Sequence, residues 1–201
     1  MISVIIPKSL EGELTVDFAR DELVGIEHEI IVAHDFNEGL ARASKPFVSF
    51  LEKDCVLSPG YFGQNLKLFG THFRKLAMVV PALGLNSWDD KLYGYSVYDG
   101  IVRPLKRPAS QEPHLIQVGY FPGAIFRTSV LQEISPVFNG HDLYKSVDLS
   151  LQIWSLGSRC ILNPHTTYVS TAEKLGNNYA TTLFDDKIYD LSKLWHRESI
   201  L

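Results

Sequence analysis

Two carboxylates, Glu52 and Asp54, follow an apolar run, Phe47 to Leu51, that has the character of a buried strand. No turn residue separates the run from the acids. Two acids one residue apart can perform two tasks, because one can bond a sugar hydroxyl while the other binds a divalent cation. Oxygen ligands of this kind suit Mg²⁺ or Mn²⁺, either of which would neutralise a diphosphate. The alternative is a strand that simply ends on solvated charges.

Two other apolar runs also end on proline or on polar residues. The run Ser3 to Ile6 is closed by Pro7. The run Glu29 to Ala33 ends on His34 and Asp35. In an open α/β sheet, ligands bind beyond the carboxyl ends of the parallel strands. We therefore expect these residues to lie near the acids at one edge of a sheet.

Strands and helices alternate over the first 80 residues, which predicts an α/β fold with a mostly parallel, Rossmann-like sheet flanked by helices. Beside the three runs above, Met78 to Pro81 predicts a fourth strand. The predicted helices are Glu13 to Leu23, a short helix capped by Asn37 that extends through Ala43, and one that begins at Pro59.

The chain beyond Gly84 has a different pattern. Aromatic residues alternate around Asp99 and Gly100 in LYGYSVYDGIV, which predicts a small antiparallel hairpin. Arg103 to Pro113 is rich in proline and polar residues and predicts a mobile loop. The remaining predictions are helices at Ala124 to Ile134 and Val147 to Leu156, a strand at Arg159 to Leu162, and a helical tail.

Composition excludes several classes of protein. The 201 residues are 45% hydrophobic, enough for a substantial core, and the net charge of −4 gives no case for a nucleic-acid partner. Cys55 and Cys160 lie beside apolar residues, so we expect reduced core cysteines, with a disulfide left open. No run approaches a transmembrane segment, and the N-terminus lacks a basic signal-peptide region. We expect a cytoplasmic protein and leave a peripheral membrane contact open.

Four stretches together resemble the family 2 glycosyltransferases, which have the GT-A fold and use nucleotide-sugars. The third of them is the most specific, because its glycines, small residues and acids are all in register. The stretches are SVIIP (Ser3 to Pro7), EIIVAHD (Glu29 to Asp35), Asn37 to Phe62, and Gly123 to Phe138 with Val147 to Cys160.

The resemblance implies roles for the residues at the strand ends. Glu52 and Asp54 stand at the positions of the DxD motif, with Glu in place of the first Asp. Asp54 would bind the metal that bridges the donor diphosphate, and Glu52 would approach the ribose or the water shell of the metal. Asp35 would contact the base, and His34 would line the base pocket. Pro7, at the end of the first strand, would also belong to the donor-binding residues.

A late histidine helps to bind metal in that family. His165 lies close to its position but not in register, since Ser170 is nearer to the expected place. The other interpretation of His165 is an ordinary loop histidine.

This chain departs from the acceptor-side motif of the family. The motif usually has the form Glu-Asp-x-Asp before a helical Leu, whereas this chain has Lys145 to Asp148 before Leu149. Ser146 therefore occupies the position of the catalytic base, and a serine cannot take a proton at neutral pH without help. Asp148 and Asp142 are the candidate bases. The alternative for Asp148 is an acid in the first turn of a helix, where the helix dipole favours it.

The resemblance implies an inverting, metal-dependent glycosyltransferase that moves a sugar from a nucleoside diphosphate donor to an unknown glycan, lipid or protein acceptor. Its single domain, 1–201, would comprise a nucleotide-sugar-binding half (1–83), an acceptor-side half (84–170) and the tail (171–201). Arg103 to Pro113 would close over the donor. The second hypothesis is a degenerate GT-A-like protein that binds a nucleotide-sugar or glycan without turnover. A nucleotidyltransferase ranks last, because Gly12 alone follows the first strand where a glycine-rich loop is needed.

Overall fold

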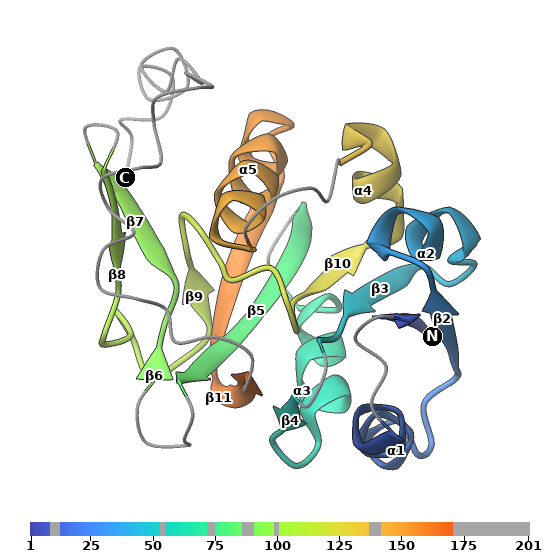
Figure 1. The fold of residues 1–201 in the computed structure, drawn as a ribbon. Helices are drawn as coiled ribbons and strands as arrows, with labels where there is room; N and C mark the ends of the chain where they lie inside the picture. The colour runs from blue at the N-terminus through green and yellow to red at the C-terminus, as the bar shows by residue number, and fades with distance from the viewer. Residues whose placement is uncertain are drawn as a thin grey trace.

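The computed structural model of the chain describes residues 1–8, 13–52, 55–71, 75–85, 91–98, 101–136 and 142–170. Figure 1 shows helices on both sides of a twisted central sheet. The helices are α1 (Glu13–Glu22), α2 (Phe36–Arg42), α3 (Tyr61–Leu68), α4 (Thr128–Ile134) and α5 (Asp142–Ser155). The strands are β1 (Ile2–Pro7), β2 (His28–Ala33), β3 (Phe47–Phe50), β4 (Val56–Leu57), β5 (Leu76–Leu85), β6 (Lys91–Leu92), β7 (Tyr95–Tyr98), β8 (Ile101–Pro104), β9 (His114–Leu115), β10 (Ile125–Arg127) and β11 (Arg159–Ser170).

The central sheet has the strand order β2-β1-β3-β10-β5-β11-β4, with β6 paired to β5 and β9 paired to β11. β1 pairs in parallel with β2 and β3, and β5 pairs in parallel with β11. β10 is antiparallel to both β3 and β5, so these two strands run in the same direction on either side of it. The prediction of a mostly parallel α/β sheet flanked by helices is confirmed.

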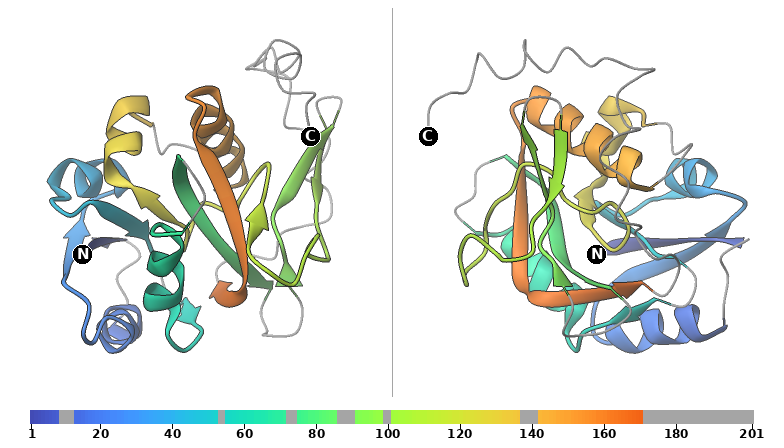
Figure 2. Two further views of the ribbon diagram at one scale, coloured as in Figure 1. Left: turned by 180° about the vertical axis from the view of Figure 1, so that it is seen from behind. Right: turned by 60° about the vertical axis from the view of Figure 1, so that its left-hand side comes forward.

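The sheet is buried on both faces because its strands are apolar on both sides. All six residues of β1 are buried, and the side chains from Val4 to Ile6 alternate between two core clusters. Val4 belongs to the cluster that contains residues of α1 and α3, and Ile5 belongs to the cluster that contains residues of α2 and α4. Figure 2 shows these helix pairs on opposite sides of the sheet. Continuous apolar runs are typical of such doubly covered strands.

β10 corrects one prediction. Ala124 to Ile134 was expected to be helical throughout, but Ile125–Arg127 forms a strand and only Thr128–Ile134 forms α4. The physical reason is tertiary. Ile125 pairs with Ser49 of β3 and Val79 of β5, and its side chain is fully buried between these strands.

β7 and β8 form the predicted antiparallel hairpin as a separate two-stranded sheet. The expected turn at 99–100 lies outside the described residues. Arg103 and Pro104 pair with Ser96 and Tyr95, so the predicted loop Arg103 to Pro113 begins as part of β8. Its closure over a donor stays a prediction, and the predicted tail, 171–201, lies outside the described residues.

Two helices begin at other residues than the sequence predicts. α3 begins at Tyr61 rather than Pro59, because Gly60 has a left-handed backbone, φ 71°, and caps the helix. α5 begins at Asp142, five residues before the predicted Val147, and extends to the expected turn at Gly157.

Both cysteines are free and buried, as expected of reduced core residues. Burial raises the pKa of the Cys55 thiol to about 12, so Cys55 is neutral at physiological pH. In the part of the chain that the structure describes, no helix is long and apolar enough to cross a membrane.

Candidate functional site

The carboxyl ends of β1, β2 and β3 lie side by side at one edge of the sheet. Pro7 ends β1 and pairs with Ala33, the residue before His34. The Leu51 N–H donates to the Ile5 carbonyl, which keeps the chain beside β1 until it reaches Glu52. The structure therefore brings Pro7, His34 and Glu52 to one edge, as the parallel arrangement predicts.

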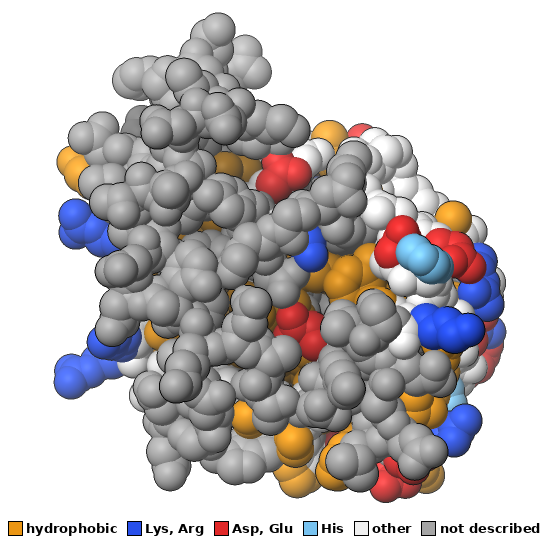
Figure 3. All heavy atoms as spheres, in the orientation of Figure 1, with side chains coloured by type: hydrophobic (Ala, Val, Ile, Leu, Met, Phe, Trp, Pro, Cys, Tyr) orange, Lys and Arg blue, Asp and Glu red, His pale blue; other side chains and the backbone are white. Residues whose placement is uncertain are grey.

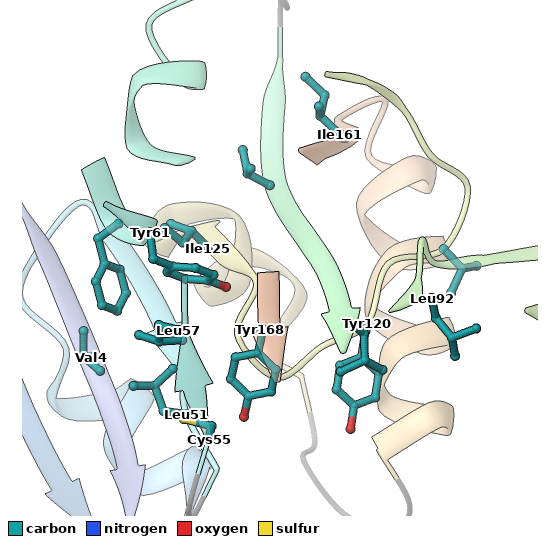
Figure 4. Close-up of a cluster of buried hydrophobic side chains, with 14 of the residues drawn as sticks. Val4, Leu51, Cys55, Leu57, Tyr61, Leu92, Tyr120, Ile125, Ile161 and Tyr168 are labelled. Atoms are coloured by element: carbon teal, nitrogen blue, oxygen red, sulfur yellow. The ribbon is translucent and has the colours of Figure 1, made fainter. Parts of the chain in front are cut away.

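Glu52 is a buried carboxylate, with 5% of its surface exposed. Its Oε2 accepts a hydrogen bond from the Tyr168 hydroxyl (3.1 Å), and its backbone N–H donates to the same hydroxyl oxygen (3.2 Å). Figure 4 shows the Tyr168 ring between Leu51 and Cys55 on one side and Tyr120 on the other. A buried charged group requires such partners, because burial without hydrogen bonds is costly. Asp54, the predicted metal ligand beside Glu52, lies outside the described residues.

Asp35 is the N-cap of α2. Its Oδ1 accepts from the Glu38 N–H (2.9 Å), and Glu38 accepts in return from the His34 N–H (2.8 Å). The predicted cap, Asn37, lies inside the helix, so that prediction is wrong. The reason is a local pattern, since Asp-x-x-Glu can satisfy N–H groups at the helix start reciprocally. The side chains of His34 and Asp35 are 90% and 55% exposed, and His34 Nδ1 lies 3.8 Å from Asp35 Oδ2.

This capping role sharpens the test of base recognition by Asp35. We expect Asp35→Ala to lower the free energy of unfolding by about 1 kcal/mol, because the helix loses its cap. Asp35→Asn should keep the cap and the stability. If Asp35 contacts the base, both variants should bind nucleotide more weakly in calorimetry. Wild-type nucleotide affinity in Asp35→Asn would show that Asp35 serves only as a cap.

Ser146, at the position of the usual base, is engaged in the core. It is fully buried, and its Oγ accepts from the Phe121 N–H (2.8 Å). Ser150, one turn later, accepts from the Gly119 N–H (3.2 Å). The two serines thus hold the segment before β10 against α5.

Asp148 is the seventh residue of α5, two turns from its start, so the expectation that it lies in the first turn is wrong. Its Oδ2 accepts from Gln152 Nε2 (2.8 Å). Its Oδ1 is buried and has no hydrogen-bond partner among the described residues. A carboxylate oxygen in this state retains its capacity to accept a proton or hydrogen bond. Asp142 is the first residue of α5 rather than part of a loop. Its side chain is not among those that the structure describes.

His165 lies on β11, where the register with β5 shifts between Asn163 and Thr167. Its side chain is 53% exposed, and its Nε2 is 3.9 Å from Glu112 Oε2. The described parts of the chain contain no group of three or more His, Cys, Asp or Glu side chains that could bind a metal. The role of His165 as a ligand stays a prediction.

The structure adds residues that sequence reasoning missed. Tyr168 contacts Glu52 across 116 positions, and no local motif signals that contact. Lys145 lies over the rings of Phe36 and Phe121, 5.9 and 5.8 Å from their centroids, and so connects α5 to the start of α2. On the face drawn in Figure 3, acidic and apolar side chains lie together near the middle, while Lys and Arg gather mainly toward the margins.

Comparison with known proteins identifies the fold as GT-A, the fold of nucleotide-sugar-dependent glycosyltransferases. The sequence matches no family model and no curated protein. Two solved structures are similar. GalNAc-T7 with UDP, GalNAc and Mn²⁺ has a TM-score of 0.55 at 10% identity, covering 84% of this chain and 43% of that chain. S. aureus TarS 1-349 with UDP-GlcNAc has a TM-score of 0.52 at 12% identity, covering 86% of this chain and 59% of that chain. The aligned part of this chain thus spans less than two thirds of the length of either of those two chains.

Proposed function

We propose that the protein is a glycosyltransferase that transfers a sugar from a nucleoside diphosphate donor to an acceptor. The observation that carries the proposal is the buried carboxylate of Glu52 at the carboxyl end of β3, in a GT-A fold. Ligands of open α/β sheets bind at this edge. The two similar structures contain UDP or UDP-GlcNAc, which supports a nucleotide-sugar as the donor.

Glu52 and the acid that follows it in the sequence have the ligand chemistry that suits a hard divalent cation. Glu52 supplies a carboxylate held in place by Tyr168, and Asp54 follows two residues later. Carboxylate oxygens suit Mn²⁺ or Mg²⁺, and the GalNAc-T7 structure contains Mn²⁺. We assign Asp54 to this ion, and Glu52 to its water shell or to the ribose of the donor. When bound, the ion would neutralise charge on the departing diphosphate.

The acceptor side of the proposal rests on Asp148. An inverting transfer needs a base that removes the proton of the acceptor hydroxyl as that oxygen attacks the anomeric carbon. Ser146 is unsuited to this task, because it is buried and bonded to the backbone of Phe121. Asp148 has a carboxylate oxygen without a partner among the described residues. Its neighbour Gln152 holds the other oxygen and would fix its orientation.

The test of the donor site is metal-dependent nucleotide binding. We expect wild-type protein to bind UDP in Mn²⁺ and to lose most of that affinity in EDTA. Asp54→Asn should weaken binding in Mn²⁺ by about tenfold or more, equivalent to about 1.4 kcal/mol. Asp17→Asn is the matched control, because Asp17 is a 68% exposed acid on α1. Equal wild-type affinity in Mn²⁺ and EDTA would contradict the metal assignment.

A second candidate function is binding of a nucleotide-sugar or glycan without turnover. The buried, bonded Ser146 at the usual base position favours it. The two functions share the donor site and differ in the release of nucleotide, so an assay of donor turnover separates them.

A further inference from the structure

The Tyr168 hydroxyl makes two contacts with one residue. It donates to the Glu52 carboxylate and accepts from the Glu52 backbone N–H. A glutamate side chain rotates about three bonds, one more than an aspartate, and therefore needs more support to present its carboxylate in one orientation. The paired bonds link the side chain and backbone of Glu52 through a single atom. They restrict the rotation that the extra methylene allows.

Tyr168 is itself held in one position. Its ring is fully buried on β11, and it packs directly against Gly123. A Cβ at Gly123 would lie 2.4 Å from Tyr168 Cδ2, so only glycine leaves room for the ring. Gly123 is fixed in turn, because its N–H donates to the Phe50 carbonyl (2.8 Å). Phe50, at the end of β3, thus fixes Gly123, and Gly123 fixes the ring of Tyr168 on β11.

We propose that Tyr168 is the positioning residue of the donor site, where it fixes the Glu52 carboxylate for contact with the ribose of a nucleoside diphosphate or with the water shell of its metal ion. This inference rests on the proposed function. It assigns to β11, 116 positions away in sequence, a part in nucleotide recognition.

The experiment measures the affinity of Mn²⁺–UDP by calorimetry for a double-mutant cycle. Tyr168→Phe removes the hydroxyl and keeps the ring, and Glu52→Gln removes the charge of its partner. We expect each single variant to weaken Mn²⁺–UDP binding by about tenfold, the scale of a lost hydrogen bond to a charged group. In the Glu52→Gln background, Tyr168→Phe should add less than about a twofold loss, because the hydroxyl acts only by positioning a carboxylate that this background lacks.

Tyr61→Phe is the matched control. Tyr61 is as buried as Tyr168 and lies in the same core, but its hydroxyl donates to the backbone carbonyl of Gly123 rather than to Glu52. Thermal denaturation of each variant establishes that it is folded at the assay temperature. We expect Tyr61→Phe to lose stability and to bind Mn²⁺–UDP within about twofold of wild type.

The outcomes separate this inference from the proposed function. If Glu52→Gln weakens Mn²⁺–UDP binding and Tyr168→Phe does not, the inference is overturned and the donor site stands. Equal losses of affinity in Tyr168→Phe and Tyr61→Phe would show a general packing effect and would also overturn it. A wild type that binds none of UDP, GDP, ADP or CDP with Mn²⁺ would overturn the proposed function, and the inference with it.

Discussion

Asp148→Asn should lower the rate of sugar transfer by a factor of about 10² to 10⁴ while donor affinity stays unchanged, the usual scale for loss of a general base. An amide has nearly the shape of the carboxylate and can still accept from Gln152, whose Nε2 is 2.8 Å from Oδ2. It cannot take a proton from an acceptor hydroxyl. Turnover under saturating donor and calorimetric donor affinity, measured on the same preparation, separate the two effects.

Two further variants control the Asp148 test. Asp142→Asn changes the other candidate base, at the first position of α5. Gln152→Leu removes the partner of Asp148 but keeps its carboxylate, so we expect a smaller loss of turnover than in Asp148→Asn. Normal turnover in Asp148→Asn with an inactive Asp142→Asn would transfer the base role to Asp142. Normal turnover in both would require a different group as base.

Gly123→Ala should lower the free energy of unfolding by about 3 kcal/mol, the combined scale of backbone strain and overpacking. Gly123 has a left-handed backbone, φ 78°, that a residue with a Cβ rarely adopts. The added methyl would lie 2.4 Å from Tyr168 Cδ2 and 3.0 Å from the Tyr61 hydroxyl oxygen. Both rings are fully buried, so neither can move aside into solvent. Urea denaturation measures the loss.

Gly63→Ala provides the control for Gly123→Ala within the same protein. Gly63 lies in α3, and a Cβ built there meets no atom within 4 Å. Alanine should therefore raise the unfolding free energy by about 0.5 to 1 kcal/mol, because it favours the helix more than glycine does. A Gly123→Ala protein within about 1 kcal/mol of wild type would contradict the tight packing around Tyr168.

The sheet edge was predictable from sequence because its strands carry their own signal. β1 is a continuous apolar run, and each of β1, β2 and β3 ends where polar residues or proline begin. β10 carried no such signal. Its three residues continue smoothly into the helical pattern of α4, and only their insertion between β3 and β5 makes them a strand. Tertiary contacts rather than local sequence therefore make β10 a strand.

The remaining errors have local and long-range causes. The Asp35 cap could have been found, because Glu38 follows it at the spacing of a capping pattern. The sequence predicted a strand from Arg159 to Leu162, but β11 passes Pro164 through a register shift and continues to Ser170. The contact between Tyr168 and Glu52 joins positions so far apart that no local pattern contains it.

The measurement that tests the central claim most directly is release of UDP from UDP-sugars by the wild-type protein, with Mn²⁺ and with EDTA. UDP-GlcNAc and UDP-GalNAc are suitable donors, since the similar structures contain UDP-GlcNAc in one case and UDP with GalNAc in the other. A glycosyltransferase should release UDP slowly by hydrolysis in Mn²⁺, faster once an acceptor is present, and not in EDTA. Binding of UDP in Mn²⁺ without release from any nucleotide-sugar, with or without acceptors, would contradict transferase activity and favour the binding protein.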